Sequence, residues 1–313
     1  MKDFINFEIQ ENDAKRLDKV VRKLLLHLPL SKIYAMIRSG EIRVNGKPKK
    51  QNYILQSDDV LQIHKSVYSE QQRTVHSDAQ TKVVLSTKHK KTIAKDSLLY
   101  KDKDFLVLAK KHGELVHGKN SLDEIVKGNS QVHSFSFKCG ALHRLDRGTT
   151  GILVFSQSLI GAQTFSQALQ SGKIIRKYFA LITGHFHEKK KIDISIGGKS
   201  AITIIKPLTV FKKVNTSFVE IEIITGRKHQ IRIHCANIGF PLLGDIQFAD
   251  CSDTQAKKNY EQKDNYFLHF YKMETKEKIL ELPSTLICPL PIRFQKKLIQ
   301  LRELEKKENN NTM

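Results

Sequence analysis

Apolar residues recur at helical spacing near the start of the chain and predict two short helices. Pro29 ends the first helix, because its ring clashes with the preceding turn. Ser31 is the expected N-cap of the second helix, and Gly40 is placed to end it as a left-handed cap residue. The apolar stripe of the first helix, at i, i+3, i+4, i+7 and i+8, consists of Leu17, Val20, Val21, Leu24 and Leu25.

Short strand-like segments follow the second helix. Ile42 and Val44 alternate with polar neighbours, and residues 60–63 form another apolar-rich segment. The pair Asn45–Gly46 predicts a tight turn, because both residue types accept positive φ. The pattern therefore predicts a compact helix–helix–strand unit over residues 13–64.

The rest of the chain carries more predicted strand than helix. Residues 152–155 form a continuous apolar run that suits a buried strand, and residues 218–224 alternate cleanly. A helix is predicted over residues 159–169. Further strands are predicted at residues 98–100, 105–108 and 176–183. Because short turns join most of them, we expect an α+β fold with a mixed, mainly antiparallel sheet and flanking helices.

Composition shifts divide the chain into segments. Residues 65–96 are polar and lack apolar periodicity, so they are interpreted as a linker. Residues 97–300 hold the larger domain, and residues 301–313 form a tail that begins helical. The chain is thus predicted to contain two domains, residues 13–64 and residues 97–300, which the linker connects and the tail follows.

Charge points to an anionic partner. The 313 residues contain 53 Lys and Arg against 32 Asp and Glu, a net charge of +21. Residues 13–50 alone hold eleven basic and three acidic residues, a local balance of +8. Charge at this density can neutralise several phosphates, whereas the alternative is a solvated helix face with extended lysines.

Cysteine usage and hydropathy indicate an intracellular protein. The four cysteines form no CxxC pair, so neither a disulfide framework nor a short metal loop is expected. No apolar run reaches the roughly 18 residues of a membrane span. The first residues include acids where a signal peptide needs an apolar stretch. We therefore expect a cytoplasmic protein without a membrane partner.

The basic unit resembles the small RNA-binding domain of ribosomal protein S4. The resemblance rests on residues 16–19, 31–33 and 37–47. It implies that the two helices and the following turn lie against structured RNA, with recognition of shape and phosphates. The basic residues that it places at the RNA are Arg16, Arg38, Arg43 and Lys47.

A loop at residues 143–151 surrounds one acid with cations. Asp146 lies among His143, Arg144 and Arg147, and nearby positive charge keeps a carboxylate ionised. An ionised carboxylate at the mouth of a strand is a candidate nucleophile. The competing interpretation is a surface salt bridge in a turn.

A second motif spans residues 225–234 and is expected to open a helix. Arg227 is predicted in the first helical turn, where it can reach a carboxylate or another anion. Lys228 and Arg232 lie on another face and are candidates for phosphate contacts. The motif contains two histidines, but their spacing matches neither HExxH nor a zinc cage, so no metal is expected.

A third motif, residues 176–180, places Tyr178 in a strand beside basic residues. The residue types alone favour a core position for this ring, and stacking on a base is the alternative. In combination, the three motifs resemble the signature of RNA pseudouridine synthases, in the branch that modifies large-subunit ribosomal RNA. Their order and separation fit the family across residues 97–300.

The resemblance implies roles for individual residues. Asp146 would be the nucleophile, and Arg227 would pair with it. Tyr178 would pack against the target base and assist proton removal, and Arg144 would fill the gap left by the flipped uridine. The other residues that we place at the RNA are His143, Arg147, Lys228 and Arg232. The resemblance implies no cofactor.

Departures from the family pattern concern positions outside these roles. Gly148 and Thr150 stand where an acid and a serine are common, and residues 109–111 replace a frequent Asn-Lys-Pro. Three alternatives stay open: a synthase acting on transfer RNA, a non-catalytic RNA-binding or ribosome-assembly protein, and a DNA-binding regulator. The turn after the two helices favours the RNA domain over a helix-turn-helix. We expect a monomer.

Overall fold

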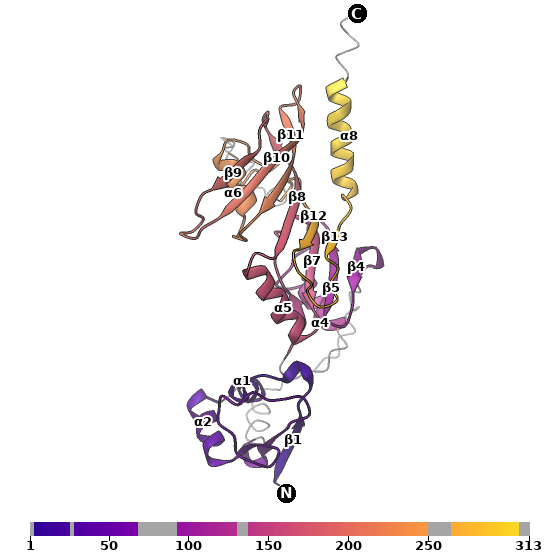
Figure 1. Ribbon diagram of the computed structural model, residues 1–313. Helices are drawn as coiled ribbons and strands as arrows, with labels where there is room; N and C mark the ends of the chain where they lie inside the picture. The colour runs from indigo at the N-terminus through magenta and orange to yellow at the C-terminus, as the bar shows by residue number, and fades with distance from the viewer. Residues whose placement is uncertain (1–2, 26–27, 68–92, 130–136, 250–263, 307–313) are drawn as a thin grey trace, which may run out of the picture. The chain divides into compact units, whose positions relative to one another are not determined.

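The computed structural model describes residues 3–25, 28–67, 93–129, 137–249 and 264–306 (Figure 1). The chain divides into two compact units, which are considered separately. The N-terminal unit includes residues 1–91, and the second unit includes most of the chain from residue 92 onward. The predicted linker lies largely outside the described residues, and so does the tail beyond residue 306.

Residues 3–64 of the N-terminal unit, apart from the undescribed positions 26–27, contain two α-helices and a three-stranded sheet. The sheet has the order β1-β3-β2, and both pairings are antiparallel. The helices and the later strands agree with the pattern-based expectation, but β1 precedes the predicted start of the unit. The elements are β1 (Phe4–Glu8), α1 (Leu17–Leu24), α2 (Leu30–Ser39), β2 (Ile42–Val44) and β3 (Val60–His64).

The ends of α2 show which local signals determine the helix. Pro29 is the N-cap, so the prediction that Ser31 caps this helix is wrong. Proline precedes the first turn with φ of −67°, which suits a helix start without a side-chain cap. Gly40 is the left-handed C-cap with φ of +79°, as predicted. The Asn45–Gly46 turn is also confirmed, because Val44 and Lys47 exchange backbone hydrogen bonds across it.

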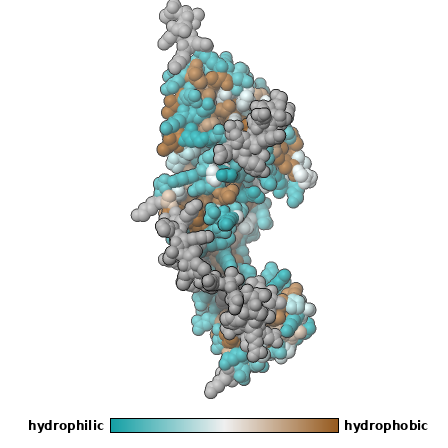
Figure 2. Space-filling model, turned by 180° about the vertical axis from the view of Figure 1, so that it is seen from behind, coloured by the Kyte–Doolittle hydropathy of each residue, from teal (hydrophilic) through white to brown (hydrophobic). Residues whose placement is uncertain are grey.

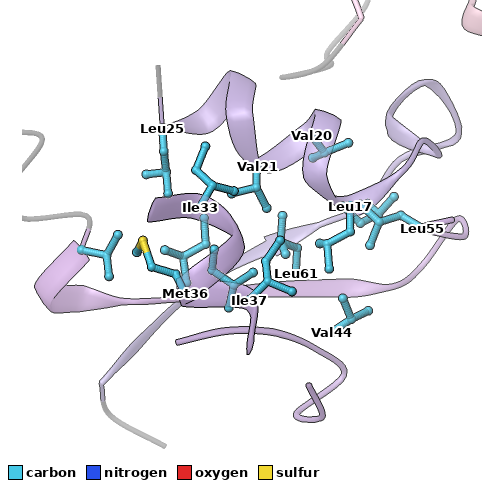
Figure 3. Packing of buried hydrophobic residues seen from close by; sticks show 14 residues of the cluster. Leu17, Val20, Val21, Leu25, Ile33, Met36, Ile37, Val44, Leu55 and Leu61 are labelled. Atoms are coloured by element: carbon cyan, nitrogen blue, oxygen red, sulfur yellow. The ribbon is translucent and has the colours of Figure 1, made fainter. Parts of the chain in front are cut away.

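The core of this unit is built from the predicted apolar stripe (Figure 3). Leu17, Val20 and Val21 of α1 are fully buried, and they face Ile33 and Ile37 of α2 in the same cluster. Residues of the β-strands close the other side. All members of this cluster belong to the N-terminal unit, so the unit has a core of its own. Burial of each full aliphatic side chain contributes about 1.5–3 kcal/mol to the free energy of folding.

The second unit is organised around a ten-stranded sheet. Its main order is β4-β5-β7-β12-β8-β11-β10-β9 (Figure 1). Among the described pairings of this sheet, only β7 with β12 is parallel, which confirms a mixed and mainly antiparallel α+β fold. The strands are β4 (Leu98–Lys101), β5 (Phe105–Lys110), β6 (Gly140–Ala141), β7 (Thr150–Ser156), β8 (Ile174–Thr183), β9 (Lys190–Asp193), β10 (Ile202–Phe211), β11 (Thr216–Ile223), β12 (Leu268–Thr275) and β13 (Thr285–Ile287).

Helices accompany the sheet. The side chains of Phe294, Leu298 and Leu301 on α8 join Leu181 and Phe211 of the sheet in one buried cluster. The predicted domain boundary at residue 300 falls inside α8, which continues without a break. The α-helices in the described part of the chain after residue 92 are α4 (Leu122–Asn129), α5 (Leu159–Gln170), α6 (Gln230–Asn237) and α8 (Ile292–Lys306).

The centre of the sheet depends on one glycine. Strand β7 is buried along its whole length, as its apolar run predicts. Gly151 has φ of +117°, and a Cβ atom there would collide with the backbone of Phe270 in β12. Only glycine permits this close approach of the two parallel strands.

The visible surface is mixed in character. Figure 2 shows hydrophobic side chains interspersed with hydrophilic ones. Large exposed apolar residues in the second unit include Ile287, Ile292 and Ile299. Within the described parts of the chain, every helix is too short or too polar to span a bilayer.

Candidate active site

Asp146 lies in the loop that leads into β7, and its carboxylate has a defined partner. The Nδ1 atom of His229 lies 2.9 Å from Oδ2 of Asp146. The side chain of Asp146 is 16% exposed and that of His229 is 21% exposed, so both are partly shielded from water. Nη1 of Arg232 lies 3.4 Å from the same Nδ1 atom. The first and second motifs therefore meet at this carboxylate.

The surroundings of Asp146 keep it ionised. Burial alone would raise the pKa of this carboxyl group, because it disfavours the charged form. The hydrogen bond with His229 and the positive charges of His229, Arg232 and Arg144 act in the opposite direction, and the net pKa is lowered. The prediction of an ionised Asp146 among cations thus has a physical basis in the structure.

A buried lysine, Lys110, donates hydrogen bonds to the loop that carries Asp146. Lys110, at the end of β5, is 2% exposed, and its Nζ donates to the carbonyls of Arg147 at 3.0 Å and Thr149 at 2.8 Å. Burial lowers the pKa of Lys110 to about 8. We did not single out this residue from the sequence. The available signal was a lysine directly after five apolar positions of a buried strand.

The three motifs line one cavity of about 510 Å³. Asp146 comes from the first motif, Tyr178 from the third, and a basic wall from the second. The charged and aromatic residues lining the cavity are Arg144, Asp146, Arg176, Tyr178, Arg227, Lys228, His229 and Arg232. A concave site with one carboxylate and several cations suits an anionic ligand that is held around a reactive group.

Tyr178 is placed on β8 with its ring against a phenyl group. The ring stacks on Phe270 with centroids 4.6 Å apart and an interplanar angle of 18°. Tyr178 is 5% exposed, and burial raises the pKa of its hydroxyl to about 12. The ring is therefore both a core residue and part of the cavity wall, and its hydroxyl is protonated at neutral pH.

Arg227 differs from its predicted placement. Helix α6 begins at Gln230, so the prediction that Arg227 lies in the first helical turn is wrong. Gln230 accepts hydrogen bonds from the Arg227 backbone and from Thr225, which holds residues 225–229 in a turn instead. The resemblance also implies that Arg227 pairs with Asp146. In the structure, Nε of Arg227 donates to the carbonyl of Ser200 at 2.9 Å.

Arg232 is buried and paired, which corrects its expected place on an open helix face. It is 1% exposed and donates to both carboxylate oxygens of Asp245, at 2.6 and 2.7 Å. The guanidinium also lies over the rings of Phe248 and Tyr266. Arg232 consequently acts on Asp146 as a fixed positive charge and is not a surface contact for phosphates.

His143 is likewise unsuited to binding phosphate. Burial lowers the pKa of its imidazole to about 3, and the nearby charge of Arg176 adds to this shift. The ring stacks on Phe165, and its Nε2 accepts a hydrogen bond from the backbone of Val154. His143 is therefore neutral and supports the loop that carries Asp146.

The remaining predicted cations of this unit are exposed. Arg144 and Lys228 line the cavity and also an adjoining hollow of about 260 Å³, which Arg147 helps to line. Nε of Arg147 donates to the carbonyl of Gly113 at 3.3 Å. These three side chains are accessible to an anionic partner.

The four basic residues predicted to contact RNA in the N-terminal unit divide into two exposed residues and two that are bonded within the unit. Arg38 and Lys47 are the exposed ones. Arg16 pairs with Asp18 at 2.8 Å, which reduces the charge that it offers to a partner. Arg43 donates to the carbonyl of Gly40 at 2.7 Å and lies over the ring of Phe4.

A cysteine and a histidine of α6 have packing and hydrogen-bonding roles. Cys235 is fully buried, and burial raises the pKa of its thiol to about 12, which confirms a packing role. His234 bonds to Thr203 and to the carbonyl of Ile194 through its two ring nitrogens. In the described portion of the chain, no three His, Cys, Asp or Glu side chains are grouped to hold a metal ion.

Comparison with known proteins gives matches to both units. Residues 104–237 match the family model described as RNA pseudouridylate synthase, and residues 15–61 match the S4 domain. A protein of Buchnera aphidicola subsp. Baizongia pistaciae named ribosomal large subunit pseudouridine synthase C is 30% identical over 264 residues. The alignment covers 78% of this chain and 80% of that protein.

Two other comparisons extend this result. The synthase C of Vibrio parahaemolyticus is 25% identical, and the alignment covers 95% of this chain and 96% of that protein. The solved structure titled human RNA pseudouridylate synthase domain containing 4 is 23% identical with a TM-score of 0.54. It covers 66% of this chain and 93% of its own. The likeness to this structure concerns the fold.

Proposed function

The chain belongs to the RNA pseudouridylate synthase family, and we propose that it converts specific uridines of large-subunit ribosomal RNA to pseudouridine with Asp146 as the nucleophile. The observation that carries the proposal is the position of Asp146 at the wall of a cation-lined cavity, with His229 2.9 Å from its carboxylate. An ionised carboxylate is the reactive form for nucleophilic attack.

The choice of RNA is supported by two features. The curated relatives named above carry the words ribosomal large subunit in their names. The S4 domain offers an exposed basic surface with Arg38 and Lys47, and such a surface holds folded RNA through its phosphates.

The reaction begins when the target uridine leaves its stack, at a cost of about a few kcal/mol. Exposed cations, including Arg144 and Lys228, offset that cost by binding the displaced backbone, and in this proposal Arg144 occupies the vacated position. Tyr178 packs against the base that enters the cavity. Because its hydroxyl is protonated, the ring supplies shape and a hydrogen-bond donor at neutral pH.

Asp146 then attacks the ribose or the uracil ring; both routes give the same overall change. The bond from C1′ to N1 breaks, a bond from C1′ to C5 forms, and the proton lost from C5 is balanced by one gained at N1. His229 orients the carboxylate, and the buried charge of Arg232 stabilises it. Arg227 lines the cavity and donates to the carbonyl of Ser200, so in this proposal it contacts RNA and does not pair with Asp146.

The residues that line the cavity all belong to the second unit of the chain. We propose that the enzyme acts as a monomer and that it meets its ribosomal RNA substrate in the cytoplasm.

The test uses purified protein, large-subunit ribosomal RNA transcripts, transfer RNA transcripts and pseudouridine mapping. We expect conversion at defined uridines of the ribosomal RNA. Asp146→Asn should reduce conversion below detection while RNA binding survives. Conversion only in transfer RNA would overturn the target, undiminished activity of Asp146→Asn would overturn the nucleophile, and RNA binding without conversion would leave only a binding protein.

A further inference from the structure

Arg176 is a buried cation in the cavity wall to which the mechanism assigns no role. It is 8% exposed and lies on β8. Its Nη2 donates to the carbonyls of Ile224 at 3.2 Å and Thr225 at 3.3 Å. Its Nε is buried and has no hydrogen-bond partner among the residues that the structure describes. Within the same residues, no carboxylate forms an ion pair with it.

This arrangement is energetically unfavourable for the free protein. Removal of a charged group from water is unfavourable unless a partner of opposite charge compensates. Two neutral carbonyl groups satisfy part of the hydrogen-bonding capacity but leave the charge uncompensated. Arg232, on α6, shows the usual arrangement, because its Nε and Nη2 atoms both donate to the carboxylate of Asp245. Arg176 is buried as well, at 8% exposed against 1% for Arg232, but it has no such acid.

The surroundings direct Arg176 toward the substrate. It precedes Tyr178 by two residues on the same strand, so both side chains lie on the cavity face of the sheet. Gly226 packs against the guanidinium, and a Cβ atom there would lie 3.0 Å from Nη1. The neighbouring His143 is neutral, so it neither compensates nor adds to the charge of Arg176.

We propose that Arg176 is a substrate-binding residue that receives a phosphate oxygen of the RNA backbone beside the flipped uridine. This inference rests on the proposed function. A phosphate is favoured over a uracil oxygen because the phosphate carries the charge that the site lacks. Guanidinium groups also match the geometry of phosphate oxygens through paired donors. The role of Arg176 is therefore to hold the target nucleotide in the cavity.

The test measures binding of two short RNA substrates that carry a methylphosphonate at the phosphate on one or the other side of the target uridine. This group replaces a charged oxygen by methyl. The enzyme forms are wild type, Arg176→Gln, Arg176→Lys and Arg302→Gln. Arg302 is an exposed residue of α8 and serves as the charge-matched control. Thermal unfolding of each variant establishes that it is folded.

We expect Arg176→Gln to weaken binding of the unmodified RNA roughly ten- to a hundredfold. One of the two methylphosphonates should weaken wild-type binding similarly and weaken Arg176→Gln little further. Arg302→Gln should keep the full methylphosphonate effect. Arg176→Lys should fall between wild type and Arg176→Gln, because it keeps the charge and loses the paired donors. If Arg176→Gln does not fold, Arg176→Met, of similar length and without charge, replaces it.

A methylphosphonate effect that stays complete in Arg176→Gln at both positions would overturn the proposal and leave Arg176 as a support for residues 224–225. These measurements use equilibrium binding and need no turnover. Conversion of the unmodified RNA by the wild-type enzyme is scored separately, so failure of the proposed function is distinguishable from failure of this inference.

Discussion

The Nδ1–H group of His229 donates to the ionised carboxylate of Asp146 across 2.9 Å, and this contact joins the two motifs that are most separated in sequence within the cavity. His229 adopts a left-handed backbone conformation with φ of +57°, directly before α6. A non-glycine residue in this conformation stores strain, and such positions are concentrated at functional sites. The contact fixes one oxygen of the carboxylate.

Replacement of His229 tests this contact. In His229→Ala, the pKa of Asp146 should rise, because burial still disfavours the carboxylate and the compensating hydrogen bond is gone. Activity requires the ionised form, so it is present above that pKa and lost as the pH falls through it. The acid limb of the single-turnover rate should therefore move to higher pH, with a rate at neutral pH reduced about ten- to a hundredfold. His187→Ala, at an exposed histidine, is the control. An unshifted acid limb would contradict the assigned role.

The buried pair of Arg232 and Asp245 predicts a separation of stability from activity. Arg232→Met should destabilise the fold by about 3–5 kcal/mol, because Asp245 remains as an uncompensated buried charge. The double variant Arg232→Met with Asp245→Leu should regain much of this loss. It should remain poorly active, because Asp146 still lacks the charge of Arg232. Urea unfolding and single-turnover rates measure the two properties, and full activity in the double variant would argue against an electrostatic role.

Lys110 predicts a pH-dependent stability difference. Its folded pKa of about 8 lies below its ordinary value of 10.5, so the unfolded chain binds the extra proton between these values. Stability from this group therefore rises as the pH increases from 8 toward 10.5, by up to about 3 kcal/mol. Lys110→Met lacks this increase. Urea unfolding of both proteins at several pH values gives the difference, in which other titrating groups cancel. A difference that is constant from pH 7 to 10 would show that the lysine is not perturbed.

The N-terminal unit predicts a change in affinity with little change in rate. The double variant Arg38→Gln with Lys47→Gln should raise the Kd for ribosomal RNA and reduce the salt slope of log Kd by about one to two. The rate at saturating RNA should stay within about twofold, since these residues lie outside the cavity. Arg16→Gln should have the smaller effect, because Asp18 already compensates that charge. An unchanged salt slope in the double variant would remove this surface from RNA binding.

Local patterns predicted most of the elements because the signals were short-range. The stripe from Leu17 to Leu25 became the buried face of α1, and the run at residues 152–155 became the centre of β7. The strand β1 was missed, because residues 4–8 reveal their role only when they pair with β3. Ser31 failed as a cap because Pro29 already starts the helix.

The site was predictable in its members and less so in its contacts. The family resemblance assigned Asp146 and Tyr178 to one site, and both residues line the same cavity. The partners of Arg227 and Arg232 depend on where α6 begins and on Asp245, which lies beyond the motif. The apolar run before Lys110 is a local signal of its burial, but the partners of Lys110 and Arg176 come from loops that are distant in sequence.

The position of β12 also determines when the chain becomes an enzyme. This strand lies between β7 and β8, and it brings the phenyl group on which Tyr178 stacks, yet it is made after both strands and after Arg232. The sheet and both helices of the N-terminal unit lie within the first 64 residues. During synthesis on the ribosome, the RNA-holding fold can therefore form early, whereas the centre of the catalytic sheet must wait for residue 275. Strand order makes catalysis a late property of the growing chain, and the nascent protein needs no inhibitor to stay inactive.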